Sequence, residues 1–283
     1  MAEVKCEYRI KEDMEFLLEA EKISCEELAE RTGISRTTII EIMKSGKTTG
    51  AVNEKFYSYA YKSGYRMNSV KEELLKEKAA KVLFHGSKYG LTEITAAGSR
   101  ENCDFGKGFY LGETYNQAMA FVCENEKSSA YSFTCSMEGL KMKRFDCSLE
   151  WMLAICYYRG TLGTYAGHKA VQTIVAEIEA CDVVVAPIAD NKMFYIMAQF
   201  TDGEINADVA LHSLSASKLG FQYVFKTSKA IKRLKPVEKY YISVPEREDC
   251  KRALNERAHE IDTKLKLAKR EFKNGLFIEE MLK

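Results

Sequence analysis

The sequence predicts an α+β fold in which a small all-helical module precedes a larger domain of mixed strands and helices. Three observations predict this class. Capped helical segments fill residues 10–75, strand-like and helical runs alternate over residues 78–245, and residues 246–283 follow one charged helical pattern. We therefore expect three parts, residues 1–75, 78–245 and 246–283, which fits a chain long enough for one small and one medium domain.

The first part contains two short helices separated by a glycine turn. Residues 24–32 fit the first helix. Ser35 is a good N-cap for a second helix over residues 36–44, and Gly46 closes it. A helix, a short turn and a capped second helix follow one another in a helix-turn-helix. Over about residues 10–65 the sequence resembles the phage-repressor-like helix-turn-helix family.

The second of these helices is where DNA contacts are expected. If the module binds DNA, Arg36, Thr37 and Thr38 would face base edges, while Lys44 and Lys47 would contact phosphates. The first 70 residues carry eleven Lys and Arg against twelve Asp and Glu, so the module as a whole is not basic. Two interpretations therefore stay open, a DNA-binding module and a protein-docking or dimerisation module.

A charged helix over residues 69–80 is expected to join this module to the next part. Strands are expected over residues 81–84, 130–137, 183–186, 223–226 and 240–244, and helices over residues 115–124, 149–159, 168–180, 191–200 and 228–234. In the last part, Leu254, Ala258, Ile261 and Leu265 recur at helical spacing. This spacing predicts a long helix packed on the domain surface, with a dimer or partner contact as the alternative.

Three segments of the middle part carry residues suited to ligand binding. His85 and Gly86 end an apolar strand-like run, two glycines precede Tyr110, and Gln222 lies in a third strand-like run. A glycine lets its backbone approach a flat amide closely, and a tyrosine offers a ring for stacking and a hydroxyl for hydrogen bonding. Together these residues are suited to holding a flat ring that bears a carboxamide, although each fragment alone is more often structural.

The ordered combination of the three segments resembles an enzyme family. Leu-Phe-His-Gly-Ser at residues 83–87, Asp-Phe-Gly-Lys-Gly-Phe-Tyr-Leu at 104–111 and Phe-Gln-Tyr-Val-Phe at 221–225 resemble the motif strands of the diphtheria-toxin-like and poly(ADP-ribose) polymerase-like ADP-ribosyltransferases. In particular, they resemble a bacterial domain family of unknown function placed in that clan. The resemblance covers most of residues 80–236 and implies a split β-sheet core with flanking helices.

The resemblance implies a role for each matching residue in binding NAD. His85 would hydrogen-bond ribose hydroxyl groups, and the backbone of Gly86 would hold the nicotinamide carboxamide. Tyr110 would stack on the nicotinamide, with Phe121 as a second aromatic on the other side of the ring. Ser87 would help to position the adenosine side.

Gln222 matches the third motif position, so the resemblance implies that His85, Tyr110 and Gln222 are the catalytic residues. Many relatives have a glutamate there. A glutamine still accepts the hydrogen bond from a ribose hydroxyl but carries no charge, and charge-assisted hydrogen bonds are roughly twice as strong as neutral ones. The substitution is therefore expected to weaken catalysis and favours transfer of a single ADP-ribose. Ala118 stands where many relatives use a serine to hold the carboxamide.

These residues lead to three hypotheses about function. The first is a mono-ADP-ribosyltransferase that uses NAD as its co-substrate, needs no metal, and modifies a protein or nucleic-acid acceptor. The second is a DNA-binding regulator or toxin–antitoxin component that senses NAD through a catalytically weak transferase fold. The third is an enzyme acting on RNA ends or 2′-phosphates, for which Lys88, Arg100 and Lys107 would have to form a phosphate pocket.

The composition indicates a cytoplasmic protein with no membrane partner, and the resemblance to a bacterial domain family implies a bacterial one. The nine cysteines contain no Cys-x-x-Cys pair and no secretory signal precedes them, so free thiols are expected. No run of about 18 apolar residues occurs, which argues against a transmembrane helix. The formal net charge of +1 indicates no acidic partner for the chain as a whole.

Other polar residues have ordinary structural explanations. Asp190 could orient the site or cap the helix that follows it, of which the cap is favoured, and His168 opens another helix. Glu204 and Asp208 could act as auxiliary acid/base groups, but exposed loop carboxylates are the commoner case. The loops around residues 189–218 would determine the acceptor.

Overall fold

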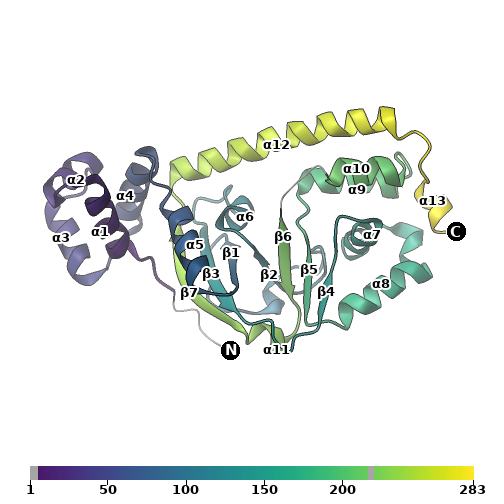
Figure 1. The fold of residues 1–283 in the computed structure, drawn as a ribbon, viewed down its shortest axis with the longest axis horizontal. Coiled ribbons are helices and arrows are strands. Elements are labelled where there is room, and N and C mark those ends of the chain that lie inside the picture. The colour runs from purple at the N-terminus through teal and green to yellow at the C-terminus, as the bar shows by residue number, and fades with distance from the viewer. Residues whose placement is uncertain (1–5, 216–219) are drawn as a thin grey trace.

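A mixed β-sheet forms the centre of the protein. The computed structural model describes residues 6–215 and 220–283, and within these residues the sheet has seven strands in the order β4-β5-β6-β2-β1-β3-β7 (Figure 1). The strands are β1 (Val82–Ser87), β2 (Phe109–Gly112), β3 (Ser129–Cys135), β4 (Met142–Arg144), β5 (Val183–Pro187), β6 (Phe221–Phe225) and β7 (Leu234–Tyr241). Strands β4 and β5 pair in parallel, and the other neighbours are antiparallel.

Helices precede, cover and follow the sheet. The N-terminal module contains α1 (Ile10–Glu21), α2 (Cys25–Thr32), α3 (Arg36–Ser45) and α4 (Gly50–Lys62), and α5 (Met67–Lys78) joins it to the sheet. The later helices are α6 (Tyr115–Ala120), α7 (Leu149–Tyr158), α8 (Lys169–Glu179), α9 (Asn191–Thr201), α10 (Ala207–Ser215), α11 (Ser228–Ile231), α12 (Val244–Glu271) and α13 (Ile278–Met281). The predicted α+β class with an N-terminal helical module is confirmed. Among the described helices, none has the length and apolarity needed to cross a membrane.

Local capping determines where the two central helices of the module begin and end. Ser24 and Glu27 form a reciprocal capping box at the start of α2, and Gly33 ends this helix with a positive φ of 66°. Ser35 accepts a hydrogen bond from the Thr38 amide at the start of α3. The predicted helix, turn and capped helix are therefore confirmed.

The two faces of the sheet are covered differently. One face packs against α7, α8, α9 and α10, and its core includes Val184, Ala186 and Val224. The other face carries Leu83, Leu111 and Phe225, which pack under loop residues and α11 instead of long helices. Side chains that alternate along a strand point to opposite faces, so neighbouring motif residues can lie in different environments.

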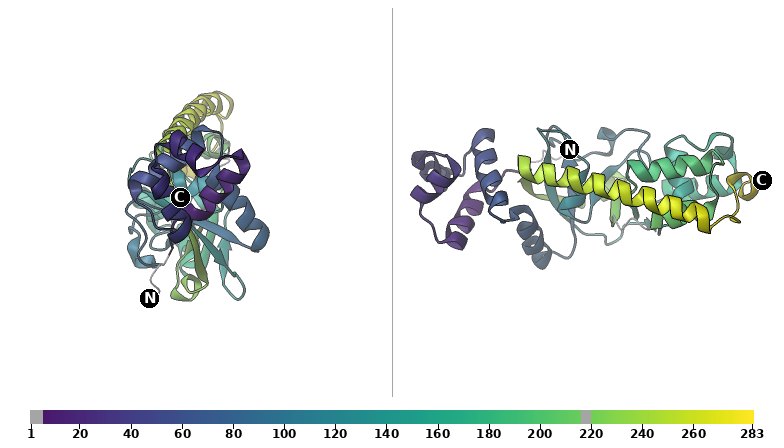
Figure 2. Two further views of the ribbon diagram at one scale, coloured as in Figure 1. Left: turned by 90° about the vertical axis from the view of Figure 1, so that its left-hand side faces the viewer. Right: turned by 90° about the horizontal axis from the view of Figure 1, so that it is seen from above.

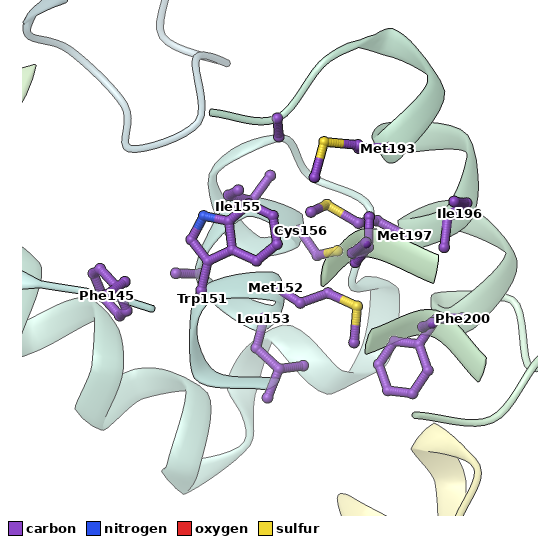
Figure 3. Close-up of a cluster of buried hydrophobic side chains, with 14 of the residues drawn as sticks. Phe145, Trp151, Met152, Leu153, Ile155, Cys156, Met193, Ile196, Met197 and Phe200 are labelled. Atoms are coloured by element: carbon purple, nitrogen blue, oxygen red, sulfur yellow. The ribbon is translucent and has the colours of Figure 1, made fainter. Parts of the chain in front are cut away.

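The helical face encloses the larger core. Trp151 is fully buried there with Met152, Ile155 and Phe200 (Figure 3). The prediction that Trp151 is a core residue is confirmed.

The C-terminal part is a long helix, as the spacing predicts. Helix α12 runs along one side of the molecule from the N-terminal module toward the far end (Figures 1 and 2). Its residues Ile261, Leu265 and Ala268 are buried against the core that includes α10. The prediction of a helix packed on the domain surface is therefore confirmed, although the helix starts at Val244 and a second short helix, α13, follows it.

Several element predictions were wrong. The expected strand over residues 240–244 is β7, which lies at Leu234–Tyr241 and contains a proline beside an irregularity in its pairing with β3. A proline is tolerated there because β7 is an edge strand with one unpaired side. Strand β4 was not predicted, since its three residues Met-Lys-Arg show no apolar pattern. Residues 207–215, expected among loops, form α10.

Candidate functional site

The sheet forks between the two strands that carry the first two motifs. Strands β1 and β2 pair only at Phe84 and Gly112, whereas β1 pairs with β3 along its whole length. From His85 onward, β1 therefore has no strand partner on its β2 side in the described part of the chain. Strand β6 lies on the other side of β2, with Gln222 opposite Gly112. The three motif segments thus occupy neighbouring strands around this fork.

His85 lies at the fork and is linked to β2 by its ring. Its Nδ1 lies 2.8 Å from the carbonyl oxygen of Tyr110, and the ring stacks on Phe109 with centroids 4.5 Å apart. A carbonyl can only accept, so Nδ1 carries the proton. Burial lowers the pKa of His85, which favours the neutral ring, and the hydrogen bond to Tyr110 opposes this only in part. Nε2 is consequently a hydrogen-bond acceptor.

Gly86 and Ser87, the next residues of β1, have clear local roles. A side chain at Gly86 would overlap the carbonyl oxygen of Ala118 on α6, so glycine is required for this helix to pack on β1. The hydroxyl of Ser87 donates to the carbonyl of Gly90 at 2.6 Å and closes the following turn. This internal bond occupies the Ser87 donor that was expected to face the adenosine.

Tyr110 uses its hydroxyl within its own loop. The hydroxyl donates to the carbonyl of Gly106 at 2.7 Å and accepts from the amide of Phe105 at 3.1 Å. Burial raises the pKa of Tyr110, so the phenol stays protonated. The hydroxyl thus holds the glycine turn in place, and stacking is the role that remains for the ring.

Phe121 lies just after α6, as its C-cap, and the residue is 58% exposed. Helix α6 ends at Ala120, before the predicted end at residue 124. Phe121 is thus a surface aromatic beside the helix that packs on Gly86.

Gln222 is buried and belongs to a polar network that the sequence did not reveal. Its Nε2 donates to Asp104 Oδ2 at 2.9 Å and to the carbonyl of Pro187 at 3.2 Å. Arg159 donates to the other oxygen of Asp104, Oδ1, from Nε at 3.0 Å and from Nη2 at 2.6 Å. The only sequence indications were a carboxylate directly before the glycine turn and an arginine ending a strongly apolar helix.

The remaining polar predictions have mixed outcomes. Asp190 accepts from the amides of Lys192 and Met193, so its role as a helix cap is confirmed. The Nδ1 of His168 accepts from the amide of Ala170 at the start of α8. Asp208 is exposed as expected, although it lies on α10 and not in a loop.

Of the three cations suggested for a phosphate pocket, one is paired with a carboxylate and two have no ion-pair partner among the described residues. Lys107 forms an ion pair with Glu101 at 2.9 Å. Lys88 and Arg100 are exposed and enter no ion pair within the described residues. No phosphate pocket follows from this arrangement.

The candidate DNA-contacting residues of α3 are on the surface, but not all are free. Arg36 pairs with Glu26 of α2. Thr37 is exposed, whereas Thr38 Oγ1 lies 2.7 Å from the Ser35 hydroxyl at the helix start. Lys44 and Lys47 are exposed at the other end of α3 and form no ion pair among the described residues. Free positive charge therefore gathers at the end of the helix.

Two protein-family models match parts of the chain. Residues 81–235, more than half of the chain, match the model of a family described as protein of unknown function, DUF3990. The chain belongs to this family. Residues 9–66 match a helix-turn-helix (HTH) domain model, which agrees with the observed order of α1 to α4. No curated protein and no solved structure matches the chain.

The DUF3990 domain also carries a groove away from the motif strands. It has a volume of about 650 Å³ and lies between the edge strand β4 and α8, with Lys141, Lys143 and Lys169 among its lining residues. Lys143 is paired with Glu150 and Glu177, so the groove is not strongly basic. The fork and this groove are separate features of the domain.

Proposed function

We propose that this chain is a DNA-binding regulator whose DUF3990 domain binds NAD⁺ at the fork between β1 and β2. The observation that carries the proposal is the position of His85, Tyr110 and Gln222 on three neighbouring strands around that fork. The resemblance of the three segments to NAD-binding motif strands supports the choice of ligand. The helix-turn-helix supports the DNA half of the proposal.

Two hydrogen-bond acceptors on these strands suit sugar hydroxyl groups, His85 on the side of the sheet that carries Phe109 and Gln222 on the side that carries Val224. The Nδ1 proton of His85 is used by the Tyr110 carbonyl, which leaves Nε2 as an acceptor. The amide nitrogen of Gln222 is used by Asp104 and Pro187, which leaves its carbonyl oxygen as an acceptor. Sugar hydroxyl groups donate to such atoms. The unpaired edge of β1 at Gly86 adds backbone groups for a carboxamide.

Transfer of ADP-ribose is the second candidate function, favoured by the firmly held carbonyl of Gln222 next to the fork. In that reaction the bond between nicotinamide and C1 of the ribose breaks, and nicotinamide leaves with the bonding electrons. An acceptor nucleophile then forms a bond to C1 and loses its proton. A neutral amide stabilises the cationic transition state less than a carboxylate would, so slow transfer is expected.

Calorimetric titration of the full-length protein with NAD⁺ tests whether the domain binds this ligand. We expect wild type to bind, and His85→Ala to bind about tenfold more weakly, the effect of losing one hydrogen bond worth about 1.4 kcal/mol. His259→Ala, at an exposed position of α12, is the matched control and should bind like wild type. Failure of wild type to bind would overturn the NAD⁺ proposal. Labelled NAD⁺ added to the same samples then separates transfer from binding alone.

Binding of the full-length protein to duplex DNA at low salt tests the proposed DNA-binding role of the helix-turn-helix module. We expect Lys44→Ala to weaken binding and to reduce the slope of log affinity against log salt by about 1, as for one lost phosphate contact. Lys62→Ala, which removes an exposed cation at the end of α4, is the comparison. If wild type shows no affinity for DNA at low salt, the module is a protein-docking or dimerisation unit.

A further inference from the structure

We propose that Asp104 is a positioning residue of the candidate NAD⁺ site. It fixes the amide of Gln222 so that the carbonyl oxygen, and not the nitrogen, is available to the ligand. This inference rests on the proposed NAD⁺ site for its ligand, but the contact between Asp104 and Gln222 can be tested without any ligand.

The orientation of the Gln222 amide follows from its partners. Both atoms within reach of Nε2 are oxygens that only accept, namely Oδ2 of the Asp104 carboxylate at 2.9 Å and the Pro187 carbonyl at 3.2 Å. Turning the amide over would place three acceptor oxygens against one another. The side chain is also buried, so water cannot compensate for such a loss.

Asp104 is itself held in place. Arg159, at the end of α7, donates twice to Oδ1, and its guanidinium lies 3.3 Å from the centre of the Phe194 ring on α9. The Asp104 side chain is 9% exposed. Helices α7 and α9 thus hold the carboxylate that orients Gln222, and Asp104 Oδ2 is left for the amide.

This arrangement determines what kind of ligand group fits beside Gln222. A hydroxyl can donate to the carbonyl oxygen of Gln222. An anionic oxygen is disfavoured, because it would face the Gln222 carbonyl oxygen, which can only accept. The position therefore selects a neutral hydroxyl-bearing group, such as a ribose.

The same contact explains why residue 222 is not a glutamate. A carboxylate there would place two negative charges about 3 Å apart in a buried site, with a carbonyl on the other side. Combining Asp104→Asn with Gln222→Glu should relieve the repulsion between the two carboxylates. The asparagine at position 104 can turn its amide nitrogen toward the glutamate at position 222.

A double-mutant cycle on thermal unfolding tests the contact. Gln222→Glu should lower Tm by about 5 °C, and Asp104→Asn should lower it less. The double variant should melt above Gln222→Glu alone. Gln172→Glu, the same change on α8, removes only an exposed hydrogen bond from Gln172 Nε2 to the Ala166 carbonyl, so it should shift Tm by less than about 2 °C and serves as the control. A double variant that loses the sum of the two single losses would overturn the inference.

Ligand discrimination tests the positioning role. Wild type should prefer NAD⁺ over an analogue without the 2′-hydroxyl of the nicotinamide ribose by about tenfold. In Asp104→Asn the Gln222 amide is free to turn, so this ratio should fall toward one. If both ligands weaken equally and the ratio stays unchanged, Asp104 is only structural. If wild type binds no NAD⁺, the proposed function fails, while the thermal cycle still decides whether Asp104 orients Gln222.

Discussion

Gly86 shows how one residue can serve both packing and ligand binding. A Cβ at this position would overlap the Ala118 carbonyl and lie 3.0 Å from a methyl group of Val122. Its φ is not positive, so the close approach of α6 is the reason for glycine. The same approach leaves the residue without a side chain at the fork, where its backbone is exposed to a carboxamide in the proposed site. The packing role and the ligand-binding role of Gly86 are compatible, but the first predicts an effect on stability and the second an effect on NAD⁺ binding.

The packing role of Gly86 can be tested by measuring stability. Gly86→Ala should lower the free energy of unfolding by about 2 kcal/mol, because α6 has to move away from β1. Chemical denaturation without ligand measures this loss. Gly50→Ala is the matched control: no atom lies within 4 Å of its added Cβ, and the residue begins a helix. An unchanged unfolding free energy in Gly86→Ala would show that α6 does not depend on this contact.

At the scale of elements, the sequence predicted best the helices whose end residues form capping hydrogen bonds. Ser24 and Ser35 cap α2 and α3 by local hydrogen bonds, so the boundaries followed from the residues alone. Helix α10 also begins with a capping hydrogen bond, in which Asn206 Oδ1 accepts from the Val209 amide, although this helix was not predicted. Strand β4 had no such indication because its pairing with β5 is set by tertiary contact.

The candidate site was predictable only in part. The three motif segments were expected to be strands, and His85, Tyr110 and Gln222 do lie on β1, β2 and β6, but the sequence did not predict that these strands are neighbours. The network around Gln222 was not predictable, because its partner Asp104 is 118 residues away in sequence. Arg159, which holds Asp104, is 63 residues from Gln222 and is brought there by the packing of α7. Internal use of the Tyr110 hydroxyl also depends on the exact path of the glycine turn.

At the scale of the whole molecule, helix α5 connects the HTH module to the DUF3990 domain through buried polar contacts. Lys71 Nζ lies 2.6 Å from Asp13 of α1 and 2.6 Å from Glu238 of β7. All three side chains are largely buried, so removal of Lys71 would leave the buried carboxylates of Asp13 and Glu238 without their shared cation. Residues 66–81 are therefore not a loose linker, and Figure 2 shows the module at one end of an elongated molecule.

A second junction lies next to the first and reaches α6. Asn68 Nδ2 lies within 3.2 Å of both carboxylate oxygens of Glu246 at the start of α12, and 2.9 Å from the Tyr115 hydroxyl of α6. Glu72 of α5 accepts from the Tyr115 amide at the start of the same helix. Contacts thus run from the HTH module through α5 to α6, the helix that packs on Gly86 at the fork.

Glu246 should make this junction sensitive to pH. Burial raises the pKa of Glu246 to about 7, and hydrogen bonds from Asn68 and Tyr115 oppose this only in part. The folded state therefore holds this proton more tightly than the unfolded chain, in which the pKa has its usual value of 4.5. The stabilisation is fully present below about pH 4.5 and is lost as the pH rises through about 7, with a total change of at most about 3 kcal/mol.

Unfolding free energies of Glu246→Gln and wild type between pH 5 and 8 test this prediction. Glutamine mimics the protonated acid and does not titrate, so the variant should lose less stability than wild type as the pH rises. Glu248→Gln, at an exposed position on the same helix, should keep the slope of wild type. Equal slopes for wild type and Glu246→Gln would mean that Glu246 is already ionised in the folded protein. The charge would then be held by Asn68 and Tyr115 despite burial, and the junction would be indifferent to pH in this range.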